Sequence, residues 1–220
     1  MQSFLSGGRR IGLDVHEPAA PGRHPAILLL HGAGGNTAFW LERIAPLVNS
    51  FGVSIYAAHY FDRTSTQRAG PEHLRDGMHV PQWLATIGDA VETIAARPAV
   101  DPERIALIGI SLGAFLALAL ATQEGGKSVR AIVEISGGLV SPYESEAGPS
   151  FPSTLIVHGE ADTVVPVAHA VRLAERLSKL GVEHESKLLA GEGHWFSPPA
   201  QASILLAVSA FLGKHLVARD

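Results

Sequence analysis

One serine stands in a sequence pattern that could make it a catalytic nucleophile. Ser111 lies at the centre of Gly109-Ile-Ser-Leu-Gly113, which has the pattern G-x-S-x-G. An apolar run over 105–108 precedes it and an Ala/Leu-rich stretch follows it, so we predict a buried strand, a tight turn and a helix. The two glycines leave the space that such a turn needs, and the turn would raise the Ser111 hydroxyl above the sheet. The pentapeptide alone is a weak signal in a chain with 23 glycines, and its place between strand and helix strengthens it.

A candidate acid and a candidate base each follow a later predicted strand. Asp162 comes after the apolar run 153–157, and His194 comes after the last predicted strand. Open parallel sheets gather ligands at the carboxyl ends of their strands, so we expect Ser111, Asp162 and His194 to meet there. The histidine would take the serine proton, and the buried carboxylate would hold the histidine in the right tautomer. Glu160 is the rival acid, but it lies nearer the strand in an expected turn.

A glycine-rich loop could supply the N–H groups that stabilise an oxyanion. His31-Gly-Ala-Gly-Gly35 follows the short apolar strand predicted over 26–30. A tetrahedral oxyanion needs free N–H donors, and we expect these to be the N–H groups of Ala33 and Leu112. A phosphate cradle or a plain turn is the alternative, but a phosphate-binding lysine is missing and G-x-G-x-x-G is not spelled. The His31 side chain is expected to lock the loop.

Two segments could contact a substrate. The loop 58–71 is polar and aromatic without a clear period, and a long loop at this end of a sheet is typical of a cleft wall. Tyr60 and Phe61 could equally pack the loop onto the sheet. Trp195 and Phe196 follow the candidate base and could either line an acyl or alcohol pocket or anchor their own loop. The candidate contacts in the first loop are His59, Tyr60, Asp62 and Arg63.

Glu134 is unusual because it stands in the apolar strand predicted over 129–135. A paired structural carboxylate is the expectation, with a polar contact at the strand end or a reserve catalytic acid as alternatives. The following loop, 136–152, is too short for a helical cap domain, so we expect an open site.

Composition limits the classes of protein and partner. The 220 residues suit a single α/β domain over 1–220. A net charge of −4 argues against a nucleic-acid partner, and the lack of cysteine excludes disulfides and thiolate metal sites. No metal-ligand spacing such as H-E-x-x-H is present, so we expect neither metal nor cofactor. The first ten residues lack a signal-peptide core and the apolar run 105–122 is broken by glycines, which favours a cytoplasmic protein without membrane contact.

Helices and apolar strands alternate along the chain, which predicts a mostly parallel sheet covered on both faces. One or two weak edge strands are expected over 3–16. Further strands are predicted over 26–30, 53–57, 105–108, 129–135, 153–157 and 183–189. Helices are predicted over 37–48, 78–97, 112–122, 167–180 and 199–215.

Four motifs together resemble those of the α/β-hydrolase superfamily. They are Gly109-Ile-Ser-Leu-Gly113, His31-Gly-Ala-Gly-Gly35, His158-Gly-Glu-Ala-Asp162 and Gly191-Glu-Gly-His194. The small, capless chain is similar to the dienelactone hydrolase-like branch. The resemblance implies Ser111 as nucleophile, Asp162 as acid, His194 as base, and Ala33 with Leu112 as oxyanion donors. Dienelactone hydrolases carry a cysteine at the nucleophile position, so a serine carboxylesterase is the better expectation.

The expected function is hydrolysis of a small ester, with a short acyl chain because no lid would enclose a long one. A thioesterase, lysophospholipase, peptidase or lactone hydrolase could use the same residues. A non-catalytic ligand-binding protein on the same fold is the alternative from another class. We expect a monomer or a homodimer whose partner is a small-molecule ester.

Overall fold

An eight-stranded sheet forms the centre of the computed structural model, which describes residues 2–217 apart from the side chains of residues 39, 40, 43 and 47. The strands follow the order β1-β2-β4-β3-β5-β6-β7-β8. β2 pairs antiparallel with both β1 and β4, and the pairs from β4 to β8 are parallel. The strands are β1 (Gln2–Ser6), β2 (Arg9–His16), β3 (His24–Leu30), β4 (Ser54–Ala58), β5 (Val100–Ile110), β6 (Val129–Ile135), β7 (Ser153–Gly159) and β8 (His184–Leu189).

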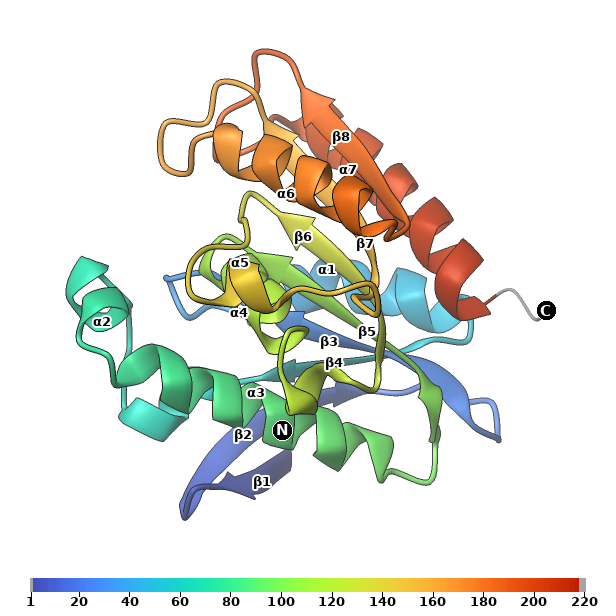
Figure 1. Cartoon of the computed structure of the whole chain (residues 1–220). Coiled ribbons are helices and arrows are strands. Elements are labelled where there is room, and N and C mark those ends of the chain that lie inside the picture. Colours follow the sequence, from blue (N-terminus) through green and yellow to red (C-terminus); the bar gives the residue numbers. More distant parts are fainter. Residues whose placement is uncertain (1, 218–220) are drawn as a thin grey trace.

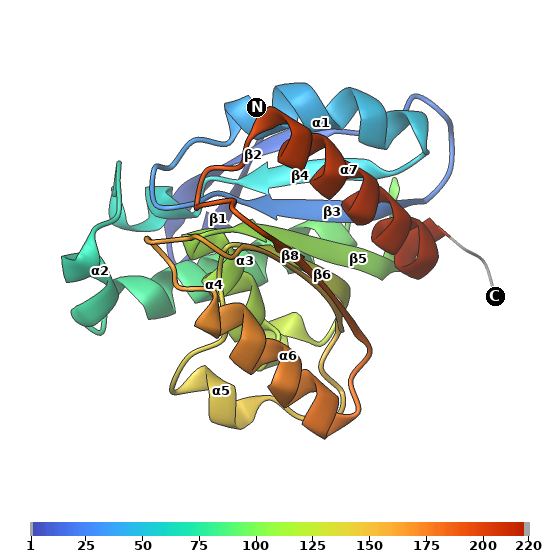
Figure 2. The ribbon, with the colours of Figure 1, turned by 90° about the horizontal axis from the view of Figure 1, so that it is seen from above.

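Helices cover both faces of this sheet. α1 and α7 lie on one face, and α3, α4 and α6 lie on the other (Figure 1, Figure 2). Short helical turns occupy three of the connections. The α-helices are α1 (Ala38–Ser50), α2 (Pro71–Arg75), α3 (His79–Ala95), α4 (Leu112–Leu120), α5 (Tyr143–Glu146), α6 (Ala168–Leu180) and α7 (Pro198–Leu212). The others are the 3-10 helices η1 (Tyr60–Thr64) and η2 (Glu124–Gly126) and the π-helix η3 (Gly213–Val217).

The pleat of the strands divides the core into two clusters, one on each face. Successive side chains of a strand point to opposite faces. On β5, Ile105 and Leu107 therefore pack toward α3 and α4, whereas Ala106 and Ile108 pack toward α1 and α7. Both faces of the central strands are buried, which explains why these strands read as continuous apolar runs.

The predicted fold class, a mostly parallel sheet with helices on both faces, is confirmed. The described residues contain no separate cap domain, since the 136–152 segment holds only the short α5. The edge-strand prediction is half right: β1 lies at the edge, but β2 lies inside the sheet between β1 and β4. β5 also begins at Val100 rather than at 105, because Val100 already pairs with His24 of β3, ahead of an irregularity in the ladder.

One apolar helix differs from the rest in how much of it is covered. Pro198–Val217 is long and apolar enough to cross a membrane by length and composition, and a third of its most apolar window is buried. It packs on the sheet through Ile204, Phe211 and Leu212. Helices that form part of a folded core pass the same test, so this observation is weak evidence for a membrane span.

Candidate active site

Ser111 stands at a strained turn between β5 and α4. Its φ is 52° and its ψ is −117°, a conformation that a non-glycine residue adopts only where the surroundings enforce it. The glycines on either side permit the turn. A Cβ on Gly109 would lie 2.4 Å from the carbonyl oxygen of Gly113, and a Cβ on Gly113 would lie 2.2 Å from the carbonyl oxygen of Leu30. The Ser111 N–H donates to the Ile135 carbonyl at 2.8 Å, which ties the turn to β6.

The structure brings together the three residues predicted as nucleophile, acid and base. His194 Nε2 lies 3.1 Å from Ser111 Oγ, and His194 Nδ1 lies 2.7 Å from Asp162 Oδ2. An ionised carboxylate only accepts hydrogen bonds, so Nδ1 carries the imidazole proton and Nε2 is left as the acceptor for the serine hydroxyl. This is the tautomer that a general base at Nε2 requires.

Asp162 is held by its own loop. Its Oδ1 accepts the N–H groups of Val164 and Val165, both at 2.8 Å, which leaves Oδ2 for His194. Burial acts to raise the pKa of Asp162, but the bonds from His194 and from the two backbone N–H groups outweigh it and lower the pKa. The carboxylate is therefore ionised although its side chain is fully buried. Glu160, the rival acid, is exposed.

The loops that carry the acid and the base are fastened to each other. The Ala161 N–H donates to the carbonyl of Glu192 at 2.8 Å. A Cβ on Gly159 would lie 2.4 Å from the same carbonyl oxygen, so only glycine allows this approach. The Glu192 carboxylate accepts the N–H and the hydroxyl of Ser197, where α7 begins. His194 is thus fixed between β8 and α7. These contacts were not predicted from the sequence.

One predicted oxyanion donor, Leu112, directly follows Ser111, and the other, Ala33, belongs to the glycine-rich loop after β3. The Ser111 carbonyl accepts the N–H groups of Ala114 and Phe115, whereas the N–H of Leu112, at the first position of α4, has no acceptor within the helix. The glycine-rich loop passes close to Ser111, since a Cβ on Gly32 would lie 3.4 Å from Ser111 Cβ. A bond from Ala69 N–H to the Ala33 carbonyl fixes the next peptide of that loop.

His31 locks the glycine-rich loop, as predicted. Its ring is buried and stacks on Tyr60 with a centroid separation of 4.1 Å. The Tyr60 hydroxyl donates to the His31 carbonyl at 2.6 Å. Burial lowers the pKa of His31 to about 4, so the imidazole is neutral and packs as an aromatic side chain. Phe61 and Trp83 complete the cluster.

The substrate contacts predicted in the loop 58–71 need correction. Tyr60 is 0% exposed, so it packs the loop onto the sheet and cannot touch a substrate. His59 Nε2 lies 2.8 Å from Asp14 Oδ2, and Asp62 accepts the N–H of Gly12. Arg63 donates to the carbonyl of Ser6. The segment folds as η1 against the β1–β2 hairpin, and these three polar side chains bond to that hairpin.

Trp195 remains a predicted substrate contact. It is 82% exposed, and its ring lies edge-on to the His194 imidazole with a centroid separation of 5.4 Å. Phe196 turns the other way, into a cavity between α1 and α7.

Glu134 is fully buried but is not the paired carboxylate that was predicted. Its Oε2 accepts the Gly137 N–H at 2.8 Å, and no cation contacts it among the described residues. Burial raises the pKa of Glu134 to about 8, and the bond from Gly137 offsets only part of that rise. The side chain is therefore a neutral carboxylic acid at neutral pH.

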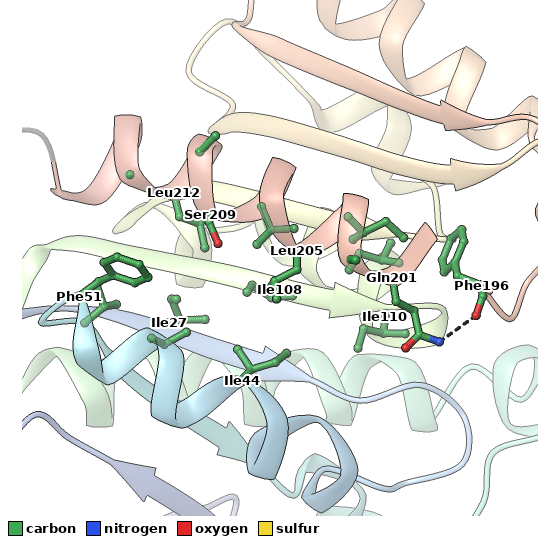
Figure 3. A pocket seen from close by; sticks show the side chains of 18 of the residues that line it. Ile27, Ile44, Phe51, Ile108, Ile110, Phe196, Gln201, Leu205, Ser209 and Leu212 are labelled. Atoms are coloured by element: carbon green, nitrogen blue, oxygen red, sulfur yellow. Dashed lines mark hydrogen bonds between the residues drawn. The ribbon is translucent and has the colours of Figure 1, made fainter. Parts of the chain in front are cut away.

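An apolar cavity of about 740 Å³ separates α1 from α7 (Figure 3). Ile27, Ile108 and Ile110 form its floor, and Ile44 and Leu205 face each other across it. None of Ser111, Asp162 and His194 lines it. One feature of the sequence indicates this apolar surface: no charged residue occurs over 198–212.

The fold and the sequence are both similar to those of known proteins. Over 97% of the chain the fold superposes on 96% of a dienelactone hydrolase-like promiscuous phosphotriesterase from metagenomic libraries, with a TM-score of 0.80 and 20% identity. That likeness defines the α/β-hydrolase fold. The model of the dienelactone hydrolase family matches residues 13–210. The chain belongs to the dienelactone hydrolase family.

Curated relatives match parts of the chain. A putative carbamate hydrolase, RutD, of Escherichia coli O1:K1 / APEC is 30% identical over 115 residues, which cover 52% of this chain and 38% of the relative. A putative esterase, NocK, of Nocardia uniformis subsp. tsuyamanensis is 29% identical over 159 residues, which cover 71% of this chain and 45% of the relative. The matches thus span less than half the length of these relatives. The chain thus belongs to a family named for a hydrolase, and one of its relatives is named a putative esterase.

Proposed function

We propose that the protein is a serine carboxylesterase that cleaves small esters through an acyl-enzyme on Ser111. The observation that carries the proposal is the hydrogen-bonded series Ser111–His194–Asp162, with the histidine tautomer that general-base catalysis needs. The series ends at a strained serine, directly followed by the N–H of Leu112, which has no acceptor within α4. Membership in a hydrolase family supports the same chemistry.

The first half of the reaction forms the acyl-enzyme. Ser111 Oγ attacks the ester carbonyl carbon while His194 Nε2 takes the hydroxyl proton. The carbonyl oxygen becomes an oxyanion, which the N–H groups of Ala33 and Leu112 bind. The carbon–oxygen bond to the alcohol then breaks, and the imidazolium returns its proton to the leaving alkoxide. Asp162 stabilises the imidazolium between these steps, because it remains ionised.

The second half repeats the chemistry with water. His194 takes a proton from a water molecule, whose oxygen attacks the acyl carbon. The second tetrahedral intermediate collapses, Ser111 recovers its proton from His194, and the carboxylic acid leaves. The protein's own side chains and backbone groups supply each step.

We propose short acyl chains as the preferred substrates. The connection between β6 and β7 carries only the four-residue helix α5, which cannot enclose a long chain. The apolar cavity between α1 and α7 is lined by none of the three catalytic residues. Trp195 would contact the substrate beside the base, since it is exposed and adjacent to the His194 ring.

Hydrolysis of p-nitrophenyl esters of increasing acyl length tests the proposal. We expect kcat/KM to be highest for short chains, and Ser111→Ala and His194→Ala each to lower kcat by a factor on the order of 10⁴ or more. The controls are Ser128→Ala and His16→Ala, which alter exposed residues at other places in the chain. A matched thioester, lactone and carbamate complete the panel, the last because one relative is named a carbamate hydrolase.

Two results would contradict parts of the proposal separately. Full activity in Ser111→Ala would show that Ser111 is not the nucleophile. Highest activity on long acyl chains would contradict the proposed preference for short ones. A phosphonate ester should give a mass increase on the peptide that contains Ser111. A protein that binds esters without turnover and without this adduct would be a ligand-binding member of the fold.

A further inference from the structure

The cavity between α1 and α7 has the size of a ligand site and no part in the proposed reaction. Its volume of about 740 Å³ falls within the range of roughly 300–1,000 Å³ that is typical of small-molecule pockets. Ser111, Asp162 and His194 do not line it. Packed interiors leave few voids larger than a water molecule, so a space of this size on one face of the sheet calls for an occupant.

The side chains that line the cavity are almost all apolar. The sheet contributes four isoleucines from β3, β5 and β6, and α1 contributes Ile44, Val48 and Phe51. Within the described part of the chain, Gln201 and Ser209 are the only polar side chains of the lining, and neither is charged. Apolar cavities take apolar ligands, and an ionised group buried here would lack a partner. The lining therefore favours an uncharged, mainly apolar ligand.

The cavity is elongated along α7. Four lining residues of this helix are spaced by four, three and four positions, as on one helix face: Gln201, Leu205, Val208 and Leu212. At about 1.5 Å per residue this stripe is about 16 Å long. Phe51 and Phe196 lie at its opposite ends (Figure 3). A long, narrow space with an aliphatic lining fits an unbranched alkyl chain better than a compact molecule.

The cavity opens to solvent between the two helices. Phe51, Leu205 and Val217 belong to its lining and are 62%, 39% and 40% exposed. Covering exposed apolar surface is favourable, so these side chains would gain from a bound chain. A ligand can thus enter from the side without unfolding either helix.

Gln201 gives the cavity one polar end. Its Nε2 donates to the Phe196 carbonyl at 2.8 Å, and because a carbonyl only accepts, the amide nitrogen must lie on that side. The Gln201 oxygen therefore points away from Phe196, beside Ile110 (Figure 3). An amide oxygen accepts hydrogen bonds. It would suit a ligand head that donates, such as a hydroxyl group, and would not suit a carboxylate, which only accepts.

An extended peptide matches this lining less well than an alkyl chain does. Each peptide residue except proline brings an N–H and a C=O that need partners when they are buried. The described lining offers only the side chains of Gln201 and Ser209 for them. An alkyl chain with one hydroxyl group needs a single partner, which Gln201 can supply.

We propose that the cavity between α1 and α7 is a binding site for a neutral single-chain amphiphile, an unbranched fatty alcohol, whose chain lies along α7 and whose hydroxyl donates to the Gln201 oxygen. This site is separate from the proposed esterase site. The bound chain would cover the isoleucines of the sheet and the apolar edge of the opening.

Isothermal titration of Ser111→Ala with 1-decanol tests the proposal without any turnover. We expect saturable binding of one decanol per chain. Decanoate at pH 8 and the compact alcohol 1-adamantanemethanol should each bind at least about tenfold more weakly, the first because of its charge and the second because of its shape. Absence of saturable decanol binding, or equal affinity for decanol and decanoate, would overturn the proposal.

Substitutions in the lining locate the ligand. Ser209→Leu and Val208→Phe add bulk inside the cavity, so each should weaken decanol binding by at least about tenfold, whereas the matched control Ser209→Ala should bind like the parent. Gln201→Leu should weaken it about fivefold through the loss of one hydrogen bond. Circular dichroism checks that each variant is folded, and two filling variants guard against the failure of one.

A control at the proposed esterase site separates the two sites. Trp195→Ala alters the side chain beside His194 and should leave decanol affinity unchanged. Weaker binding in Trp195→Ala together with parent-like binding in both Ser209→Leu and Val208→Phe would place decanol in the esterase site and overturn the proposal. Sedimentation at rising protein concentration tests the other occupant, since a dimer that decanol does not dissociate and that blocks its binding would assign the cavity to a second copy of the chain. None of these readouts requires ester hydrolysis, so their failure is distinct from failure of the esterase assignment.

Discussion

Asp162 and Glu134 are both buried carboxyl groups, and the backbone around them decides which one is charged. Asp162 receives two backbone N–H groups and the His194 imidazole, and these bonds outweigh burial and lower its pKa. Glu134 receives one N–H group, and burial raises its pKa to about 8. Of the two, the ionised Asp162, which bonds to His194, is the one suited to stabilise an imidazolium.

The elevated pKa of Glu134 has a consequence for stability. Between the ordinary glutamate pKa of 4.5 and about 8, the folded state keeps a proton that the unfolded state has lost. Stability then falls as pH rises, by up to about 1.4 kcal/mol per pH unit for this group, and the loss ends above the folded pKa. Glu134→Gln removes the titration, so its advantage over the parent should grow from pH 5 to pH 8. Urea unfolding across this range measures the difference, and parallel curves for the two proteins would disprove it.

At the scale of the element, the turn from β5 to α4 depends on close backbone contact. A Cβ on Gly113 would lie 2.2 Å from the carbonyl oxygen of Leu30 and 2.7 Å from that of His31. Both contacts are to backbone, so no side-chain rotation relieves them, and the end of β3 with its glycine-rich loop must move. The turn that carries Ser111 and the proposed oxyanion loop are therefore packed so tightly that a change in one must shift the other.

The substitution Gly113→Ala tests this coupling between the turn and the loop. We expect a loss of stability of about 1–3 kcal/mol from overpacking and a larger relative loss of kcat than of substrate affinity, because the oxyanion donor on the loop shifts. The control is Gly148→Ala, since a Cβ there has open space and an ordinary φ. Unfolding curves and esterase kinetics measure the two effects. Unchanged kcat in Gly113→Ala would show that the loop tolerates the displacement.

The sequence was sufficient to predict the elements that carry Ser111, Asp162 and His194, because each residue follows a predicted strand and these strands end at the same edge of the sheet. It was not sufficient for the loop 58–71. Its polar residues are predicted to line a cleft, but Asp62 and His59 form hydrogen bonds to the β1–β2 hairpin. Such pairings join segments about 50 residues apart, and residue type and spacing carry no signal of them. Glu134 shows the same limit, since its lack of a cation is a property of the packed core.

At the scale of the molecule, the two faces of the sheet are covered unequally. α3, α4 and α6 pack closely on one face, whereas α1 and α7 leave the apolar cavity of about 740 Å³ on the other (Figure 2, Figure 3). The absence of charge along α7 places apolar side chains on its exposed side as well, and Leu206 is 73% exposed. Ser111, Asp162 and His194 do not line this cavity, so we expect substitutions in it to change stability without changing esterase activity.

Ser209→Leu provides the test of that separation. Ser209 lies on α7 and lines the cavity, so a leucine side chain at this position would add apolar contacts with the opposite wall. We expect a gain of about 0.5–2 kcal/mol in the free energy of unfolding, with kcat and KM for short esters unchanged. Ser209→Ala is the matched control, because it gives α7 a comparable improvement in helix propensity without filling the cavity. Equal stability of the two variants would mean that leucine does not enter the cavity, and a fall in kcat of Ser209→Leu alone would mean that the cavity communicates with the active site.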